Sequence, residues 1–163
     1  MRVSVEAMAQ DIGGLLEGFQ LQITTAESCT GGGLAQAITS VAGSSQWFER
    51  GFITYSDQSK QDMLGVSSAT IEQYGAVSEQ VVKEMAQGAI QCSGAHMSVA
   101  ITGIAGPEGG SEEKPVGTVW IAWGQKLGYT EAECFQFGGT RNHIRAQAVL
   151  ESLRGSRRRL LKQ

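Results

Sequence analysis

Apolar residues recur every three or four positions in several segments, which is the pattern of helices with one buried face. The pattern predicts helices over residues 4–18, 34–41, 81–90 and 146–153, with one or two short helices within 57–74. Ser78 precedes the third of these stripes and is suited to be its N-cap, because a serine hydroxyl accepts a hydrogen bond from the first helical turn.

Other segments are rich in β-branched and aromatic residues and predict strands. They span residues 21–28, 48–56, 96–102, 117–124 and 130–137. The third and fourth are apolar on both alternating faces, as expected for central strands covered on two sides. Strands that are first separated by helices and then adjacent in the sequence predict an α/β fold, a single layered α/β/α domain whose mixed β-sheet is flanked by helices.

Size and charge narrow the class of protein. The 163 residues suffice for one domain, which we expect to span 1–163. A net charge of −3 argues against general nucleic-acid binding, and the basic C-terminal tail at 154–163 is interpreted as a solvated helix end. No apolar stretch approaches the ~20 residues that cross a bilayer, so no membrane partner is expected.

The cysteines and the N-terminus bear on compartment and metal content. Three cysteines are scattered without a CxxC pair and the two histidines lie far apart, so no metal site is predicted from ligand spacing. Reduced thiols, together with an N-terminus that lacks the apolar run of a signal peptide, predict a cytoplasmic protein.

Glycine is the compositional outlier. The 22 glycines are about twice the average share of ~7%, and they cluster at 31–33, 103–110 and 138–139. Glycines at the ends of apolar segments indicate backbone brought close to a ligand.

The first cluster follows Ser28, which ends a predicted strand, and a helix begins near Gly33. Backbone amides of residues 29–33 would then point outward and form an anion site or an oxyanion hole. Two alternatives stay open at this point. The segment is a simple turn of small residues, or Cys29 is the nucleophile as a thiolate activated at a helix N-terminus.

Two further loops follow predicted strands, at 54–60 and 102–118. Loops at the carboxyl ends of strands gather around one crevice in an α/β sheet, so both are expected near Ser28. Lys60 could act as a base if burial lowers its pKa, and Tyr55 could relay or orient the proton. The alternatives are a surface lysine and a strand tyrosine with a satisfied hydroxyl.

Arg141 and Arg145 begin the last helix and lie four residues apart, on one helical face. Such a pair could meet a phosphate or a carboxylate. Ordinary surface pairing is the alternative.

Four strings together resemble one family: TTAESCTGGG, GSSQWFERGFITYSDQSK, GAVSE and ITGIAGPEGGSEEKPVGTVWIA. The family is the nicotinamide-nucleotide amidohydrolases, the stand-alone relatives of the C-terminal domain of the competence-damage protein CinA. The resemblance covers residues 5–155, which we take as the core. The longer CinA proteins also have an N-terminal molybdopterin-binding-like domain, so the resemblance implies the single-domain form.

The resemblance implies hydrolysis of the carboxamide of nicotinamide mononucleotide to nicotinate mononucleotide and ammonia, in pyridine nucleotide recycling. It implies a serine assisted by a lysine and a tyrosine, with no metal and no cofactor, and Ser28, Tyr55 and Lys60 stand at the matching positions. The expected oxyanion donors are the amides of Cys29, Thr30 and Gly31. The candidates for substrate binding are Glu27, Gly32, Thr102, Gly103, Gly106 and Arg141. A cytoplasmic homodimer is the expected assembly.

Two other functions remain open. A non-catalytic nucleotide-binding module would keep the glycine loops and arginines but would have no need of Ser28, Tyr55 and Lys60 together. Hydrolysis of another small amide is the narrower alternative.

Overall fold

The computed structural model describes residues 3–163 and contains one mixed β-sheet of five strands in the order β2-β1-β3-β4-β5. The strands are β1 (Ile23–Glu27), β2 (Phe48–Ile53), β3 (Met97–Gly103), β4 (Thr118–Gln125) and β5 (Thr130–Gln136). The first three run parallel, whereas β4 and β5 are antiparallel to their neighbours. The change of direction follows from the connections, because helices join the parallel strands, whereas the loop 104–117 and the short turn 126–129 join the antiparallel ones without a helix.

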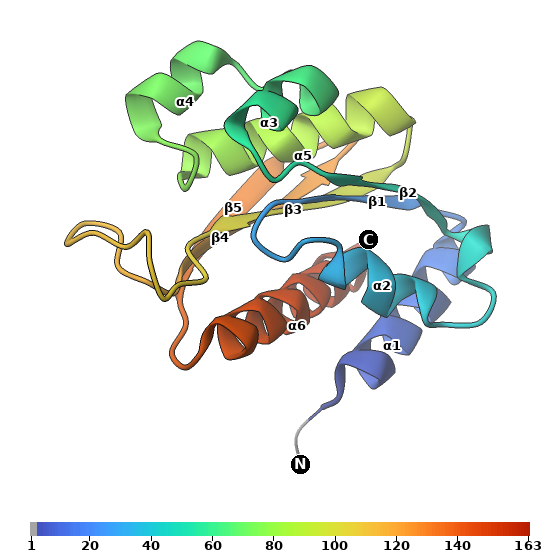
Figure 1. The fold of residues 1–163 in the computed structure, drawn as a ribbon. Helices are drawn as coiled ribbons and strands as arrows, with labels where there is room; N and C mark the ends of the chain where they lie inside the picture. The colour runs from blue at the N-terminus through green and yellow to red at the C-terminus, as the bar shows by residue number, and fades with distance from the viewer. Residues whose placement is uncertain (1–2) are drawn as a thin grey trace.

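Helices cover both faces of this sheet (Figure 1). One face carries α1 (Val5–Phe19), α2 (Gly33–Thr39) and α6 (Arg141–Leu160). The other carries α3 (Asp57–Leu64), α4 (Ser68–Tyr74) and α5 (Glu79–Ser93). The predicted α/β/α layering is therefore confirmed, and residues 57–74 form two short helices separated by a turn at Gly65.

The core consists of two apolar clusters, one on each side of the sheet. Strand β3 contributes to both, because Val99 and Ile101 belong to the first cluster and Ala100 to the second. Residues 97–102 are all buried, which explains why this segment is apolar without alternation. Strand β3 is the middle strand and β4 lies between β3 and β5, so both predicted central strands are interior strands of the sheet.

Serine and threonine side chains fix where four helices begin, namely α1, α3, α5 and α6. Ser4 Oγ accepts from the amide of Ala7 at 3.0 Å, and Ser78 Oγ accepts from the amide of Val81 at 3.2 Å. Thr140 caps α6 in the same way. The N-cap predicted at Ser78 is thus confirmed.

The C-terminal segment differs from expectation. Helix α6 continues to Leu160, which is buried, so the core extends past residue 155. The Arg159 guanidinium lies 4.0 Å from the ring centroid of Trp123 and donates to Glu131 at 2.8 Å. Only 7% of Arg159 is exposed, so the solvated helix end predicted for 154–163 is wrong at this residue. An arginine can be buried here because an aromatic face and carboxylates replace its water.

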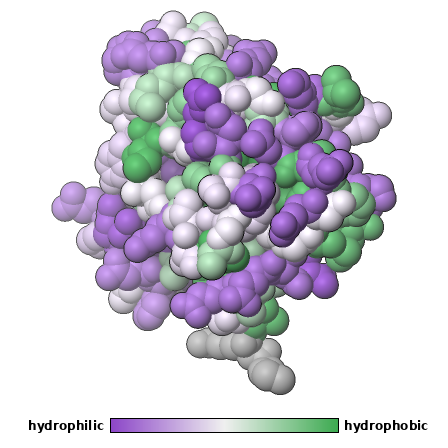
Figure 2. Space-filling view, turned by 90° about the vertical axis from the view of Figure 1, so that its right-hand side faces the viewer, coloured by the Kyte–Doolittle hydropathy of each residue, from purple (hydrophilic) through white to green (hydrophobic). Residues whose placement is uncertain are grey.

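The side of the molecule seen in Figure 2 mixes hydrophilic and apolar side chains, with hydrophilic ones covering more of it. Among residues 3–163, no helix combines the length and the apolar character needed to cross a membrane.

Candidate active site

The parallel strands β1, β2 and β3 end at the same edge of the sheet, and a cavity of about 280 Å³ opens there. Ser28 follows β1, Tyr55 follows β2, and Thr102 and Gly103 end β3. All four line the cavity together with Lys60. The expectation that the loops after these strands share one crevice is therefore met.

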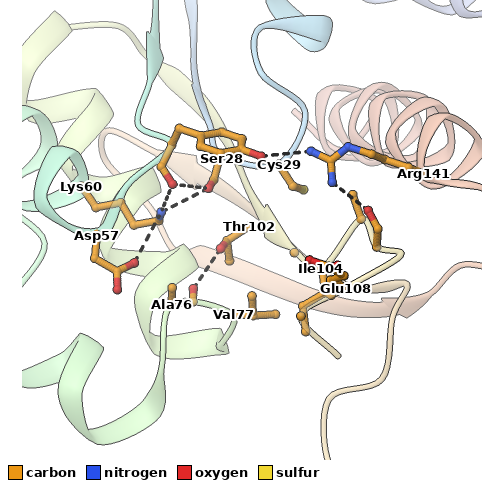
Figure 3. Close-up of a pocket in the computed structure, with 15 residues that line it drawn as sticks. Ser28, Cys29, Asp57, Lys60, Ala76, Val77, Thr102, Ile104, Glu108 and Arg141 are labelled. Atoms are coloured by element: carbon orange, nitrogen blue, oxygen red, sulfur yellow. Dashed lines mark hydrogen bonds and ion pairs between the residues drawn. The ribbon is translucent and has the colours of Figure 1, made fainter. Parts of the chain in front are cut away.

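The central feature of the cavity is the contact between Ser28 and Lys60 (Figure 3). The Lys60 Nζ atom lies 3.1 Å from Ser28 Oγ, and 7% of Ser28 and 1% of Lys60 are exposed. Lys60 lies in the first turn of α3, which Ser56 caps by accepting the amide of Ser59. The cap fixes where α3 begins, and from its first turn the Lys60 side chain reaches Ser28.

Burial lowers the pKa of Lys60 from its ordinary value, because the ammonium loses the water that stabilises its charge. The carboxylate of Asp57, 4.0 Å away, partly opposes this effect. The structure therefore favours the neutral amine more than a surface position would, and the surface-lysine alternative is wrong.

The hydrogen bonds around Nζ suit either protonation state, because its three acceptors, Ser28 Oγ and two carbonyl oxygens, match the three N–H donors of an ammonium. The carbonyl oxygens of Thr54 and Tyr55 lie 3.1 Å and 3.3 Å from Nζ and accept hydrogen bonds from it. A neutral amine has two N–H donors for these carbonyls and one lone pair, which remains for the Ser28 hydroxyl. The same geometry lets the amine receive the serine proton.

The side chain of Tyr55 takes a different direction from the one expected of a proton relay. Its hydroxyl accepts a hydrogen bond from Arg141 Nη2 at 3.0 Å, and 59% of the residue is exposed. It is the Tyr55 carbonyl, not the phenol, that contacts Lys60 and, at 3.4 Å, Ser28 Oγ. Tyr55 therefore lines the cavity but contacts Ser28 and Lys60 through its backbone carbonyl.

The loop after Ser28 offers two of the three expected amide donors. Gly31 N–H donates to the Ser28 carbonyl at 3.0 Å, so this amide already has an acceptor within the loop. Among residues 3–163, no backbone carbonyl accepts a hydrogen bond from the N–H group of Cys29 or Thr30. Gly31 and Gly32 have φ of +57° and +101°, so the chain makes a left-handed turn between these amides and the start of α2.

Glu27 and Gly32 are not part of the cavity wall. The Glu27 carboxylate accepts from Thr30 Oγ1 at 2.7 Å and from the amides of Leu34 and Ala35 at 2.8 and 3.0 Å. It is buried and caps the N-terminus of α2, so it shapes the Ser28 loop. Substrate binding by Glu27 and Gly32 therefore stays a prediction from the resemblance, and Gly32 forms part of the left-handed turn.

The rival nucleophile is disfavoured by its surroundings. Burial raises the pKa of Cys29 to about 11, so its thiol stays protonated near neutral pH. The activated thiolate considered from the sequence is not supported. The Cys29 carbonyl accepts from Arg145 Nε at 3.1 Å, which ties the loop to α6.

The second glycine loop forms the opposite wall. Thr102 Oγ1 donates to the Ala76 carbonyl at 2.9 Å, and the carbonyl of Gly106, which has φ of +78°, accepts from Arg141 Nη1 at 2.8 Å. Gly103 packs against β4, where a Cβ would lie 2.7 Å from a Val119 methyl group. Arg141 therefore joins this loop to Tyr55 across the cavity.

The structure separates the two arginines that the sequence placed on one helical face. Arg141 lines the cavity, whereas Arg145 donates to the carbonyls of Cys29 and Thr30 and positions the Ser28 loop.

Two acidic residues also line the cavity, Asp57 and Glu108, and neither was singled out from the sequence. The signal for Asp57 was its place three residues before Lys60 on the same helix. Nowhere in residues 3–163 do three His, Cys, Asp or Glu side chains gather as a metal site would require.

Comparison with known proteins shows the family of the chain. The model of the CinA C-terminal domain matches residues 5–160, and the chain belongs to this family. It is 52% identical over 155 residues to a protein named nicotinamide-nucleotide amidohydrolase PncC from Enterobacter agglomerans, covering 95% of this chain and 94% of that one. It is also 52% identical over 148 residues to the protein of the same name from Escherichia coli K12, covering 90% and 88%.

Solved structures agree with the fold. A CinA superfamily protein from Klebsiella pneumoniae superposes with a TM-score of 0.95 at 35% identity, covering 99% of this chain and 100% of that one. A competence/damage-inducible protein from Agrobacterium tumefaciens gives a TM-score of 0.93 at 42% identity over the full length of both chains. The resemblance stated from the sequence is thus confirmed.

Proposed function

We propose that the protein hydrolyses the carboxamide of nicotinamide mononucleotide, giving nicotinate mononucleotide and ammonia. The observation that carries the proposal is the 3.1 Å contact between Lys60 Nζ and Ser28 Oγ inside a cavity. A serine hydroxyl needs a base to become a nucleophile, and a buried amine supplies one. The choice of substrate is supported by relatives over 50% identical that bear the name of this activity.

In the first step, the neutral amine of Lys60 accepts the Ser28 proton while Oγ forms a bond to the carboxamide carbon. The carbonyl oxygen becomes an oxyanion, which the N–H groups of Cys29 and Thr30 can receive. Removing one such donor typically slows catalysis by ~10²–10³.

The C–N bond then breaks, the Lys60 ammonium returns its proton to the leaving nitrogen, and ammonia departs. A nicotinate ester of Ser28 remains. A water molecule gives a proton to Lys60 and attacks the ester carbon, which releases the carboxylate product and restores the serine hydroxyl. The balance is one amide and one water consumed for one carboxylic acid and one ammonia.

The rest of the nucleotide holds the amide in place for attack, because binding energy remote from the reacting carbon fixes its orientation. Arg141 is the cation on the cavity wall suited to the phosphate. Its guanidinium has five N–H donors and uses two nitrogens on Gly106 and Tyr55, so donors remain. In this proposal Tyr55 holds Arg141 and Lys60 in position instead of relaying a proton, and Thr102, Gly103 and Gly106 form the wall against the substrate.

A binding module without catalysis is the competing function, and the Ser28–Lys60 contact argues against it, because binding alone requires no buried amine beside a serine. The proposal also includes the cytoplasmic homodimer and the role in pyridine nucleotide recycling that the sequence led us to expect. Sedimentation of the purified protein tests the dimer.

The test of the activity is ammonia release from nicotinamide mononucleotide in the presence of EDTA. We expect release by the native protein and none above background from Ser28→Ala. Equal release from both would remove Ser28 from the mechanism. Binding of the nucleotide without release by the native protein would leave the binding module. The free base and the riboside, assayed beside the nucleotide, test the alternative of another small amide.

A further inference from the structure

Charge is unevenly distributed around the cavity (Figure 3). Asp57 lies on the Lys60 side of Ser28, whereas Arg141 lies on the other side, next to the second glycine loop. The Asp57 side chain is 59% exposed, and Lys60 is the only side chain among residues 3–163 that pairs with its carboxylate. A ligand in the cavity can therefore reach a negative group at one end and a positive group at the other.

Asp57 opposes the proposed base, Lys60. Its charge stabilises the ammonium form of Lys60, whereas catalysis requires the neutral amine. A cation bound beside Asp57 reverses this effect, because it neutralises the carboxylate and repels the proton on Lys60. The position of Asp57 thus fits a substrate that itself carries positive charge near the reacting amide.

We propose that Asp57 is a specificity residue that recognises a positively charged aromatic ring, so that the site selects a cationic pyridinium amide over the same nucleotide with a reduced, neutral ring. The inference rests on the proposed function and specifies its substrate class. The carboxamide is bonded directly to the ring, so a carbonyl carbon held at Ser28 brings the ring next to Lys60 and Asp57. The phosphate then extends towards Arg141, and the two charges of the nucleotide match the two ends of the cavity.

Glu108 is the other carboxylate on the cavity wall, and it lies on the Arg141 side, away from Lys60 (Figure 3). From there it is close to the expected path of the ribose and phosphate rather than to the ring. Removing the charge of Asp57 is therefore expected to affect recognition of the ring, whereas removing the charge of Glu108 is not.

The experiment measures dissociation constants by titration calorimetry, with Ser28→Ala as the parent because it binds without turnover. The two ligands are nicotinamide mononucleotide and its reduced form, which differ in ring charge. We expect the parent to bind the oxidised form about tenfold more tightly, the size of one partly solvated charge pair. Adding Asp57→Asn is expected to weaken oxidised binding about tenfold and to leave reduced binding within about twofold.

Three matched variants in the same parent complete the test. Asp57→Glu keeps the charge and is expected to keep the preference. Asp62→Asn removes a charge from the exposed side of the same helix and is expected to change nothing, since Asp62 contacts Gln58 and does not line the cavity. Glu108→Gln is expected to leave the preference for the oxidised ring intact.

Equal affinity of the parent for both ring forms would overturn the inference while leaving the proposed function in place. An equal loss of affinity for both ring forms in Asp57→Asn would overturn it too. So would loss of the preference for the oxidised ring in Glu108→Gln. Failure of the parent to bind either form would instead overturn the proposed function, and this inference with it.

Discussion

The amine of Lys60 lies 3.1 Å from the hydroxyl of Ser28, although 32 residues separate them in the sequence. The contact forms because β1 and β2 run parallel and end at the same edge of the sheet, so the residues after the two strands meet. Lys60 then has three partners, two carbonyls and the serine, inside a site that excludes water from its side chain.

Ser28→Ala is expected to lower kcat by about 10⁴-fold or more, since loss of a nucleophile removes the covalent path. The matched control is Cys29→Ala, the neighbouring residue with a thiol of raised pKa, for which we expect kcat within about threefold of the native protein. Steady-state ammonia release measures both. Inactivation by Cys29→Ala alone, with the fold intact by circular dichroism, would assign the chemistry to the thiol.

The pH dependence of kcat/KM reports the protonation of Lys60 in the free enzyme. Activity is expected to rise with pH through the pKa of Lys60, because only the neutral amine accepts the serine proton. Burial lowers this pKa below its ordinary value, and the negative charge of Asp57 partly opposes the lowering. Asp57→Asn should therefore move the rising limb to lower pH, because it removes the negative charge that stabilises the ammonium form of Lys60.

Asp62→Asn is the control for that profile, and its limb should coincide with the native one. Lys60→Arg should abolish the limb together with most activity, since arginine does not lose its proton in this range. A limb that stays in place in Asp57→Asn would contradict the assignment to Lys60.

Glu27→Gln is expected to lower the free energy of unfolding by about 1–3 kcal/mol. The two carboxylate oxygens accept hydrogen bonds from two backbone N–H groups, and in glutamine one of these N–H groups would face the side-chain NH₂ instead. Urea denaturation measures the change. Glu17→Gln, at an exposed position of α1, should stay within about 0.5 kcal/mol. A higher KM without loss of stability would show that Glu27 contacts substrate after all.

Two helical glycines make a matched pair for packing. A Cβ at Gly155 would lie 2.0 Å from Trp123 Cζ2, so Gly155→Ala should destabilise the protein by about 1–3 kcal/mol. A Cβ at Gly14 meets nothing within 4 Å, so Gly14→Ala should stabilise it by about 0.5–1 kcal/mol through helix propensity. Thermal unfolding followed by circular dichroism compares them, and equal effects would contradict close packing of α6 on Trp123.

The elements of the fold follow from local patterns because period and capping are properties of short segments. The apolar stripe before Gly18 predicted α1, Ser78 predicted the start of α5, and the unbroken apolar run at 96–102 predicted a central strand. The prediction failed at Arg159, because its burial depends on Trp123 and Glu131 from two strands far away in the sequence. Local charge alone indicated solvent there.

For the site, the sequence by itself determined that Ser28, Tyr55 and Lys60 gather, since each lies in the segment after a strand and such segments share one edge of the sheet. Only the tertiary structure decided how they are used. In the folded chain the Tyr55 hydroxyl accepts from Arg141, the Glu27 carboxylate accepts from the first amides of α2, and Asp57 lies beside the Lys60 amine. The reason is physical: strand order fixes where a backbone ends, whereas the direction, burial and pKa of a side chain depend on atoms that other segments bring to it.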